Sequence, residues 1–294
     1  MSTLFDTFFM KINKISPDTH DFLQIVSGIA KPPKSLYFIG KLPERRIPSV
    51  AVVGSRRPTT YGKEVTHRFA YDLARQGIAI MSGLAIGVDG IAHRGALEAG
   101  GTTIAVLGNG LDSIYPSAHK QLARDIVTAG GAIISEYEPD VLARGFQFLE
   151  RNRIVSGLAD AVLITEAASR SGTLNTAAHA LEQGKEVFVV PGNITSVMSA
   201  GCNQLLKQGA TPVTCAEDIL EIIAPQLLTE QATLPLGNTP EESQIIELLQ
   251  EGIRDGDELQ RRSGIEPSTL SMSLTMLELN STIRALGANQ WTLK

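Results

Sequence analysis

Residues 49–83 read SVAVVGSRRPTTYGKEVTHRFAYDLARQGIAIMSG, and this stretch decides the fold. It begins and ends with short apolar runs of strand length. Between them, Val65, Phe69 and Leu73 recur at the spacing of one face of a helix. Strands that are apolar on both faces need cover on both sides, so the pattern predicts a parallel sheet with helices packed against it.

The same alternation continues far along the chain. The runs expected to form strands are SVAVVG, IAIMSG, TTIAVLG, AIISEY, DAVLITE and EVFVVPG. A second helical pattern joins Leu174, Ala177, Ala178 and Leu181. We therefore predict an α/β domain over residues 48–223, with a doubly wound, mostly parallel sheet of the extended Rossmann-like kind.

Both ends of the chain differ from this central pattern. Residues 224–240 hold three prolines and no Lys or Arg, which indicates a linker. Residues 241–294 show three helical patterns and then two short runs around a Gly-Ala-Asn turn, the outline of a small C-terminal winged-helix domain. Residues 1–47 are expected to form short helices and are too few for a core of their own.

The composition favours a protein that is not embedded in a membrane. No apolar run approaches the roughly 18 residues that a bilayer-spanning helix needs. Cys202 and Cys215 are too few for a disulfide framework, so we expect reduced thiols in a cytoplasmic protein. The net charge is −5, and residues 241–294 carry nine Asp and Glu against five Lys and Arg. Nucleic-acid binding would therefore need a local basic site.

Small and polar residues follow the predicted strands at their carboxyl ends. These turns are residues 54–56, 82–97, 108–116 and 167–184. Ligands of open α/β sheets bind at this edge, where glycines let backbone N–H groups approach an anion and helix N-termini attract it. The sequence therefore predicts a phosphate or anion site there.

Catalytic and cofactor motifs are weak. Ser113 stands where a dinucleotide fingerprint needs its third glycine, and no P-loop occurs. Asp89 and His93 are four residues apart on a predicted helix and would suit an acid–base pair or two metal ligands. The alternative, which we favour, is that Asp89 caps the helix and His93 packs against a neighbouring loop. We expect no catalysis, no cofactor and no bound metal.

Residues 144–160 combine positive charge with aromatic rings. The residues concerned are Arg144, Phe146, Phe148, Arg151 and Arg153. Single-stranded nucleic acid needs cations for its phosphates and aromatic faces for its bases. The alternative is a core phenylalanine with solvated arginines, and this segment alone does not separate the two. Either Phe148 or Phe146 could be the exposed ring.

Taken together, the motifs resemble those of one family. The segments VAVVGSRRPTTYG, SGLAIGVDGIAHRGAL, TIAVLGNGLDSIYP, ISEY, RNRIVSGLADAVLITEA, SRSGTLNTAAHALEQGKEVFVVPG and GCNQLLKQGA resemble, in order and spacing, the DNA-processing protein A family (DprA, also called Smf). The resemblance implies a cytoplasmic, non-enzymatic protein that binds single-stranded DNA without sequence specificity. It also implies loading of the RecA recombinase onto that DNA in DNA uptake, competence for natural transformation and homologous recombination. A homodimer is the expected assembly.

The resemblance also assigns DNA-binding residues. Arg56 would hold a phosphate, with the N–H groups of the two preceding residues beside it, and Phe148 would be an aromatic platform. Leu149 and Glu150 depart from the family, which often has a proline and a basic residue there, and this alters the reach of the loop. The residues implied to bind DNA are Gly54, Ser55, Arg56, Ser82, Gly83, Phe148, Arg151, Asn152, Arg153, Arg170, Ser171, Gly172 and Thr173.

Two other functions fit the predicted fold. A nucleotide-binding sensor or an enzyme resembling the nucleoside-monophosphate phosphoribohydrolases would need Pro-Gly-Gly-x-Gly-Thr before the corresponding helix, where this chain reads SRSGTLNT. A regulator that binds duplex DNA would use the helix EPSTLSMSLTMLELN for recognition, but that segment contains no Lys or Arg.

Overall fold

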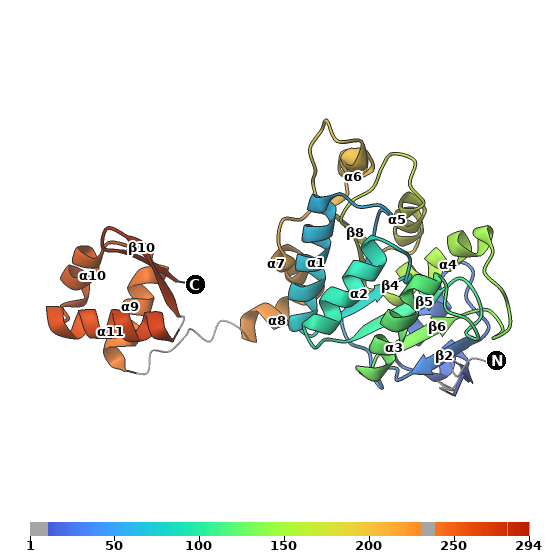
Figure 1. Cartoon of the computed structure of the whole chain (residues 1–294), viewed down its shortest axis with the longest axis horizontal. Coiled ribbons are helices and arrows are strands. Elements are labelled where there is room, and N and C mark those ends of the chain that lie inside the picture. The colour runs from blue at the N-terminus through green and yellow to red at the C-terminus, as the bar shows by residue number, and fades with distance from the viewer. Residues whose placement is uncertain (1–10, 231–238, 281, 294) are drawn as a thin grey trace, which may run out of the picture. The chain divides into compact units, whose positions relative to one another are not determined.

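The computed structural model describes residues 11–230, 239–280 and 282–293, which form two compact units that divide at Pro225. In the first unit the described residues form one sheet with helices on both faces (Figure 1). The strand order is β1-β2-β6-β5-β4-β3-β7-β8-β9, and neighbours from β6 onward run parallel. The strands are β1 (Asn13–Ile15), β2 (Leu36–Gly40), β3 (Ser49–Val53), β4 (Ala79–Ser82), β5 (Thr103–Leu107), β6 (Ala132–Ser135), β7 (Ala161–Ile164), β8 (Glu186–Val189) and β9 (Thr211–Pro212).

The predicted doubly wound sheet is confirmed, and each expected strand is present. Successive strand residues face opposite sides, so in β5 Ile104 and Val106 enter one hydrophobic core while Ala105 and Leu107 enter the other. The helices of this unit are α1 (Thr60–Arg75), α2 (Val88–Glu98), α3 (Lys120–Thr128), α4 (Gly145–Leu158), α5 (Thr173–Glu182), α6 (Ala200–Lys207) and α7 (Ala216–Ile223). In the described part of the chain, no helix combines the length and apolarity needed to cross a bilayer.

The N-terminal segment belongs to the sheet, which corrects the expectation of a separate helical segment over residues 1–47. Its described residues supply two strands, of which β2 pairs antiparallel with β6 and β1 pairs antiparallel with β2. Two 3₁₀ turns, Pro17–Thr19 and Gln24–Gly28, lie between these strands. The five-residue run LYFIG of β2 is too short for periodicity to separate strand from helix. Residues 1–10 lie outside the described residues.

The second unit confirms the winged-helix outline. From Thr239 onward, its described residues form three helices followed by an antiparallel hairpin, with a hydrophobic core of their own. The first helix begins one residue after Thr239, whose side chain accepts a hydrogen bond from the Glu242 N–H. Within the expected linker, 224–240, α8 (Pro225–Glu230) forms near the start and α9 begins at the last residue, Pro240, which corrects both ends of the expectation. Residues 231–238 lie outside the described residues. The elements are α9 (Pro240–Gln250), α10 (Gly256–Ser263), α11 (Pro267–Leu279), β10 (Ile283–Gly287) and β11 (Gln290–Leu293).

Candidate nucleic-acid interface

A cavity of about 500 Å³ opens at the carboxyl edge of the sheet, where the sequence predicts an anion site. Its walls come from the turn after β3, from helix α4 and from the loop between β7 and α5. These segments are distant in sequence and meet because parallel strands end at one edge. We call it the Arg56 cavity, and the residues lining it include Gly54, Ser55, Arg56, Asp89, Phe148, Leu149, Arg151, Asn152, Ser171, Gly172 and Thr173.

The turn after β3 is fixed by hydrogen bonds. The Ser55 N–H donates to the Glu166 carbonyl (2.8 Å), and the Arg57 N–H donates to the Ser55 hydroxyl (3.0 Å). A Cβ atom at Gly54 would lie 2.9 Å from the Glu166 carbonyl oxygen, so this close approach requires glycine. The expectation that the Ser55 N–H faces a phosphate is corrected, because that donor is used inside the protein. Arg56 remains exposed.

Arg56 lies over a pair of aromatic rings. Its guanidinium carbon is 5.7 Å from the centroid of the Phe148 ring, within the range of a cation–π contact. Phe148 in turn stacks on Tyr115, with ring centroids 5.3 Å apart. Phe146 is 56% exposed and does not line the cavity, so Phe148 is the ring that the fold brings to Arg56. Sequence reasoning missed Tyr115, whose signal was its place in the 108–116 turn at the same edge.

Arg151 is buried beneath the cavity. Its Nη1 donates to the Gly83 carbonyl (2.6 Å) and to the Val106 carbonyl. A Cβ atom at Gly83 would overlap the guanidinium, so a side chain at position 83 would displace Arg151. Burial raises the pKa of Asp89, and the Arg151 guanidinium opposes that rise. Arg151 thus joins α4 to the ends of β4 and β5, so the guanidinium that the resemblance assigned to DNA binding is bonded within the protein.

Arg153 lies on a different side of α4. Its Nη2 donates to both carboxylate oxygens of Glu136, at 2.6 Å each. It lines a separate cavity of about 230 Å³ with Lys31 and His179. Residues two apart on a helix point in different directions, so the structure does not bring Arg153 to the Arg56 cavity.

Ser82 and Gly83 do not reach the surface. Ser82 is fully buried, and its hydroxyl donates to the Val52 carbonyl (2.7 Å). The Gly83 N–H donates to an Asp89 carboxylate oxygen (3.0 Å), and the Gly83 carbonyl accepts from Arg151. The expectation that both residues offer DNA a contact surface is corrected, because their polar groups stabilise the protein interior.

The loop before α5 forms another wall of the Arg56 cavity. The Thr173 N–H donates to the Ser171 hydroxyl (3.2 Å), which donates to Thr173 Oγ1 (2.8 Å). Helix α5 begins at Thr173, with Gly172 at its N-cap, and the N-terminus of a helix attracts negative charge. Asn152 lines the same cavity, whereas the exposed Arg170 does not. Arg56 is therefore the exposed cation of this cavity, with a helix N-terminus nearby.

Asp89 and His93 do not form an acid–base pair. Asp89 accepts from the N–H groups of the loop before α2, whereas His93 Nδ1 lies 2.7 Å from Thr103 Oγ1. The Thr103 hydroxyl already donates to the Ile80 carbonyl, so His93 Nδ1 carries the hydrogen. Burial lowers the pKa of His93 to about 3, and the ring stays neutral. Both side chains stabilise the fold, but the expectation that Asp89 caps the helix is wrong, because Gly87 is the N-cap of α2 and no side chain bonds there.

The two departures from the family motif have separate environments. Glu150 is exposed, and it accepts a hydrogen bond from the Tyr137 hydroxyl (2.8 Å). Burial, and then the bond to Glu150, raise the pKa of Tyr137. Leu149 is 49% exposed and lines the Arg56 cavity, so this chain has an apolar side chain where the family often has proline.

Comparison with known proteins places these features in a family. The family model described as DNA recombination-mediator protein A matches residues 13–224, and the one described as DprA winged helix domain matches residues 229–289. Protein Smf of Escherichia coli is 49% identical over 189 residues, which are 64% of this chain and 50% of that protein. The chain thus spans about half the length of this relative.

Two solved structures are similar to this chain over most of its length. The X-ray structure of DNA processing protein A from Streptococcus pneumoniae has a TM-score of 0.67 and 38% identity, and the match covers 73% of this chain and 75% of that one. The second is DNA processing protein A from Helicobacter pylori, whose structure is described for its single-stranded DNA binding mode. It has a TM-score of 0.63 and 33% identity, and the match covers 76% of this chain and 98% of that one.

Proposed function

Because this chain belongs to the DNA recombination-mediator protein A family, we propose that it is a DNA-processing protein that binds single-stranded DNA without sequence specificity. The observation that carries the proposal is the cluster at the carboxyl edge of the sheet. There Arg56 lies 5.7 Å from the Phe148 ring, which stacks on Tyr115. The described binding mode of the Helicobacter pylori relative supports the same ligand.

The cluster offers single-stranded DNA two kinds of contact. Arg56 supplies a cation for a phosphate, and the N-terminus of α5 adds a favourable dipole. Phe148 and Tyr115 supply aromatic faces on which any base can stack, so these stacking contacts do not depend on which base is present. The bases of a duplex are already stacked and paired, which explains a preference for single strands.

Other residues have supporting roles in this proposal. Asn152, Ser171 and Thr173 carry polar groups at the Arg56 cavity for the sugar-phosphate backbone, and Arg170 supplies a second exposed cation next to the loop. Arg151 positions α4 through its bonds to the interior. Arg153 acts away from the DNA, because it is paired with Glu136.

The proposal extends to recombination. The family description, recombination mediator, supports a role in loading RecA recombinase onto bound single strands, in the cytoplasm, during DNA uptake and natural transformation. A homodimer of the sheet domain would present two Arg56 cavities to one strand, which raises affinity through effective concentration. Catalysis has no part in this function.

The test compares single-stranded and duplex oligonucleotides of one sequence in a gel shift with the purified chain. We expect the single strand to shift at protein concentrations that leave the duplex free. Equal affinity for both, or no shift of either, would overturn the proposal. The loading step is tested separately: RecA is added to the protein–DNA complex, and the DNA-dependent ATPase activity of RecA is measured.

A further inference from the structure

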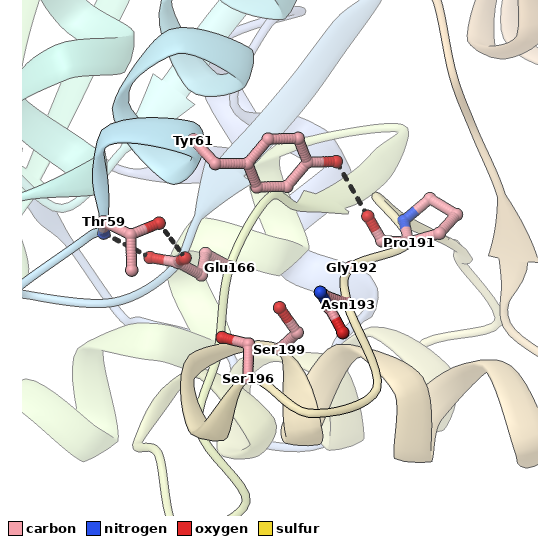
Figure 2. A pocket seen from close by; sticks show the side chains of 8 residues that line it. All are labelled: Thr59, Tyr61, Glu166, Pro191, Gly192, Asn193, Ser196 and Ser199. Atoms are coloured by element: carbon pink, nitrogen blue, oxygen red, sulfur yellow. Dashed lines mark hydrogen bonds between the residues drawn. The ribbon is translucent and has the colours of Figure 1, made fainter.

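A second cavity lies on the other side of the turn after β3. Its volume is about 430 Å³, and we call it the Glu166 cavity (Figure 2). It is formed by the start of α1, the end of β7 and the loop that leads from β8 to α6. The side chains that decide its chemistry are Tyr61, Glu166, Pro191, Ser196 and Ser199.

Glu166 places a buried carboxylate in this cavity. Its side chain is held by Thr59, whose N–H donates to Oε2 (2.8 Å) and whose hydroxyl donates to Oε1 (2.6 Å). A Cβ atom at Gly62 would lie 2.5 Å from Oε2, so glycine makes room for the carboxylate at the start of α1. Each carboxylate oxygen can accept more than one hydrogen bond, so both remain able to receive a donor from a ligand.

Tyr61 supplies a flat wall. Its ring is 45% exposed and extends from α1 towards the loop that carries Pro191, as Figure 2 shows. The hydroxyl donates to the Pro191 carbonyl (2.8 Å), which fixes the ring in this position. Burial raises the pKa of the Tyr61 hydroxyl, so it remains a neutral donor. A flat ligand next to Glu166 would lie against this ring and the proline.

Two serine hydroxyls complete the cavity. Ser199 is 5% exposed and Ser196 half-buried, and both belong to the loop and 3₁₀ turn that lead into α6. Within the described residues, neither side-chain hydroxyl has a hydrogen-bond partner. Both hydroxyls line the cavity, so a ligand there can form hydrogen bonds with them.

The lining chemistry separates this cavity from the Arg56 cavity. Lys, Arg and His are absent from its lining, which contains one carboxylate, hydroxyls, an aromatic ring and a proline. A phosphate would be repelled by Glu166 and would find no cation. A flat, neutral ring that carries an amino group suits it better, because the amine donates to the carboxylate and the ring stacks on tyrosine.

We propose that the Glu166 cavity receives an amine-bearing nucleobase. The inference rests on the proposed function, because the turn from Gly54 to Thr59 separates the two cavities and one strand can supply the phosphate and the base. On one side of that turn Ser55 bonds to the Glu166 backbone, and on the other Thr59 bonds to its side chain. Cytosine, adenine and guanine carry the required amine, whereas thymine and uracil have no exocyclic amine and flank their single N3–H donor with two carbonyls.

The test uses oligonucleotides of about 12 nucleotides, made only of dC, dU or dT, a length within the range bound by single-strand sites. Uracil has a carbonyl where cytosine has the amine and an N3–H where cytosine has an acceptor nitrogen, and it differs from thymine only in the methyl group. The three probes therefore separate the amine-bearing edge of cytosine from an effect of the methyl group. We expect oligo-dC to bind about tenfold more tightly than oligo-dU, as for a hydrogen bond to a charged group, and oligo-dU to match oligo-dT. Equal affinity for all three would overturn the base site but leave the proposed function standing.

Variants of the cavity sharpen the result. Glu166→Gln exchanges one acceptor oxygen for an amide donor, so the ratio between oligo-dC and oligo-dU should fall to about one or invert. Tyr61→Ala removes an exposed ring without loss of core and should abolish the preference, whereas Tyr61→Phe keeps the ring and most of the preference. Arg56→Ala should weaken all three probes equally, and a change of their ratio would contradict the separation of the cavities.

A free nucleoside distinguishes a base on the strand from a soluble ligand. Saturation-transfer NMR with deoxycytidine alone, in wild type and Tyr61→Ala, reports binding to the cavity without DNA. Transfer in wild type that Tyr61→Ala abolishes supports the site, even if no oligonucleotide binds and the proposed function fails. Equal affinity of the three oligonucleotides overturns the inference, and where none of them binds, absence of deoxycytidine transfer overturns it.

Discussion

Helix α4 of the sheet domain and helix α11 of the winged-helix domain present different surfaces. In α4, Phe148 lies in contact with the exposed Arg56 at the edge of the sheet. In α11, Met272, Met276 and Leu279 are 65%, 44% and 73% exposed, and the helix contains no Lys or Arg. Their spacing places these three side chains on one helix face. A winged-helix outline therefore does not by itself predict DNA contact, because phosphate binding needs a cation at the surface.

The largest effect should come from Arg56→Ala, which removes the cation on which the comparison rests. We expect the affinity for single strands to fall about thirtyfold, in the range of a charged hydrogen bond. The salt dependence should flatten by about 0.7 in log–log slope, the value for one phosphate contact on a single strand. Fluorescence anisotropy at several salt concentrations measures both quantities.

The neighbouring arginine is the matched control for this prediction. Arg57 is also exposed but does not line the Arg56 cavity. Arg57→Ala should therefore change affinity and salt slope much less than Arg56→Ala. If the two variants behave alike, the cation acts through the general field of the turn, and the cavity is not where the phosphate binds.

A smaller effect is expected from Phe148→Ala. Loss of a stacking platform costs about 1–3 kcal/mol per base, so we expect about a tenfold loss of affinity. The salt slope should stay near that of wild type, because a ring neutralises no phosphate. Phe146→Ala, on the same helix, should leave affinity unchanged. If Phe146→Ala melts at the wild-type temperature but loses DNA binding, the roles of the two rings have been assigned the wrong way round.

The layered sheet was predictable because its strands are apolar on both faces. In β5, Ile104 and Val106 pack into one core, and Ala105 and Leu107 pack into the other. The run TTIAVLG therefore suits a strand that is buried on both faces. The N-terminal strands were missed because both are short: β1, at the edge of the sheet, has three residues and β2 has five. Pairing with β6 is a tertiary contact that overrides a weak local pattern.

The site was less predictable than the fold. Composition marked α4 as basic, but the sequence could not say that Arg151 bonds to carbonyls at Gly83 and Val106 or that Arg153 pairs with Glu136. Those partners lie on other strands and turns, so their contacts exist only after folding. The family resemblance assigned both Arg56 and Phe148 to DNA binding, but their contact was not predicted.

Arg153→Ala should affect DNA binding still less. Its guanidinium is already bonded to both oxygens of Glu136, so we expect affinity within about threefold of wild type and an unchanged salt slope. The variant should instead unfold more easily, by about 2 kcal/mol, because Glu136 loses a charged hydrogen-bond partner. Chemical denaturation measures the loss, and Glu136→Ala should reproduce much of it. A flattened salt slope in Arg153→Ala would place this arginine on the DNA.

The smallest effect concerns the winged-helix domain. A fragment of residues 239–294 has its own core of residues such as Ile245, Leu259 and Leu274, so we expect it to fold, which circular dichroism checks. Its cations are partly neutralised, since Arg261 and Arg262 both pair with Glu258. We therefore expect no gel shift of duplex DNA at ~0.15 M salt, where surface charges are largely screened beyond a Debye length.

Replacing Met272 and Met276 by lysine puts two cations on the exposed face of α11, away from the core. If the lack of cations is what keeps this domain off DNA, that double variant should gain weak, salt-sensitive duplex binding. A clear duplex shift by the unmodified fragment would break the contrast between α4 and α11 and give the second domain a DNA-binding role of its own.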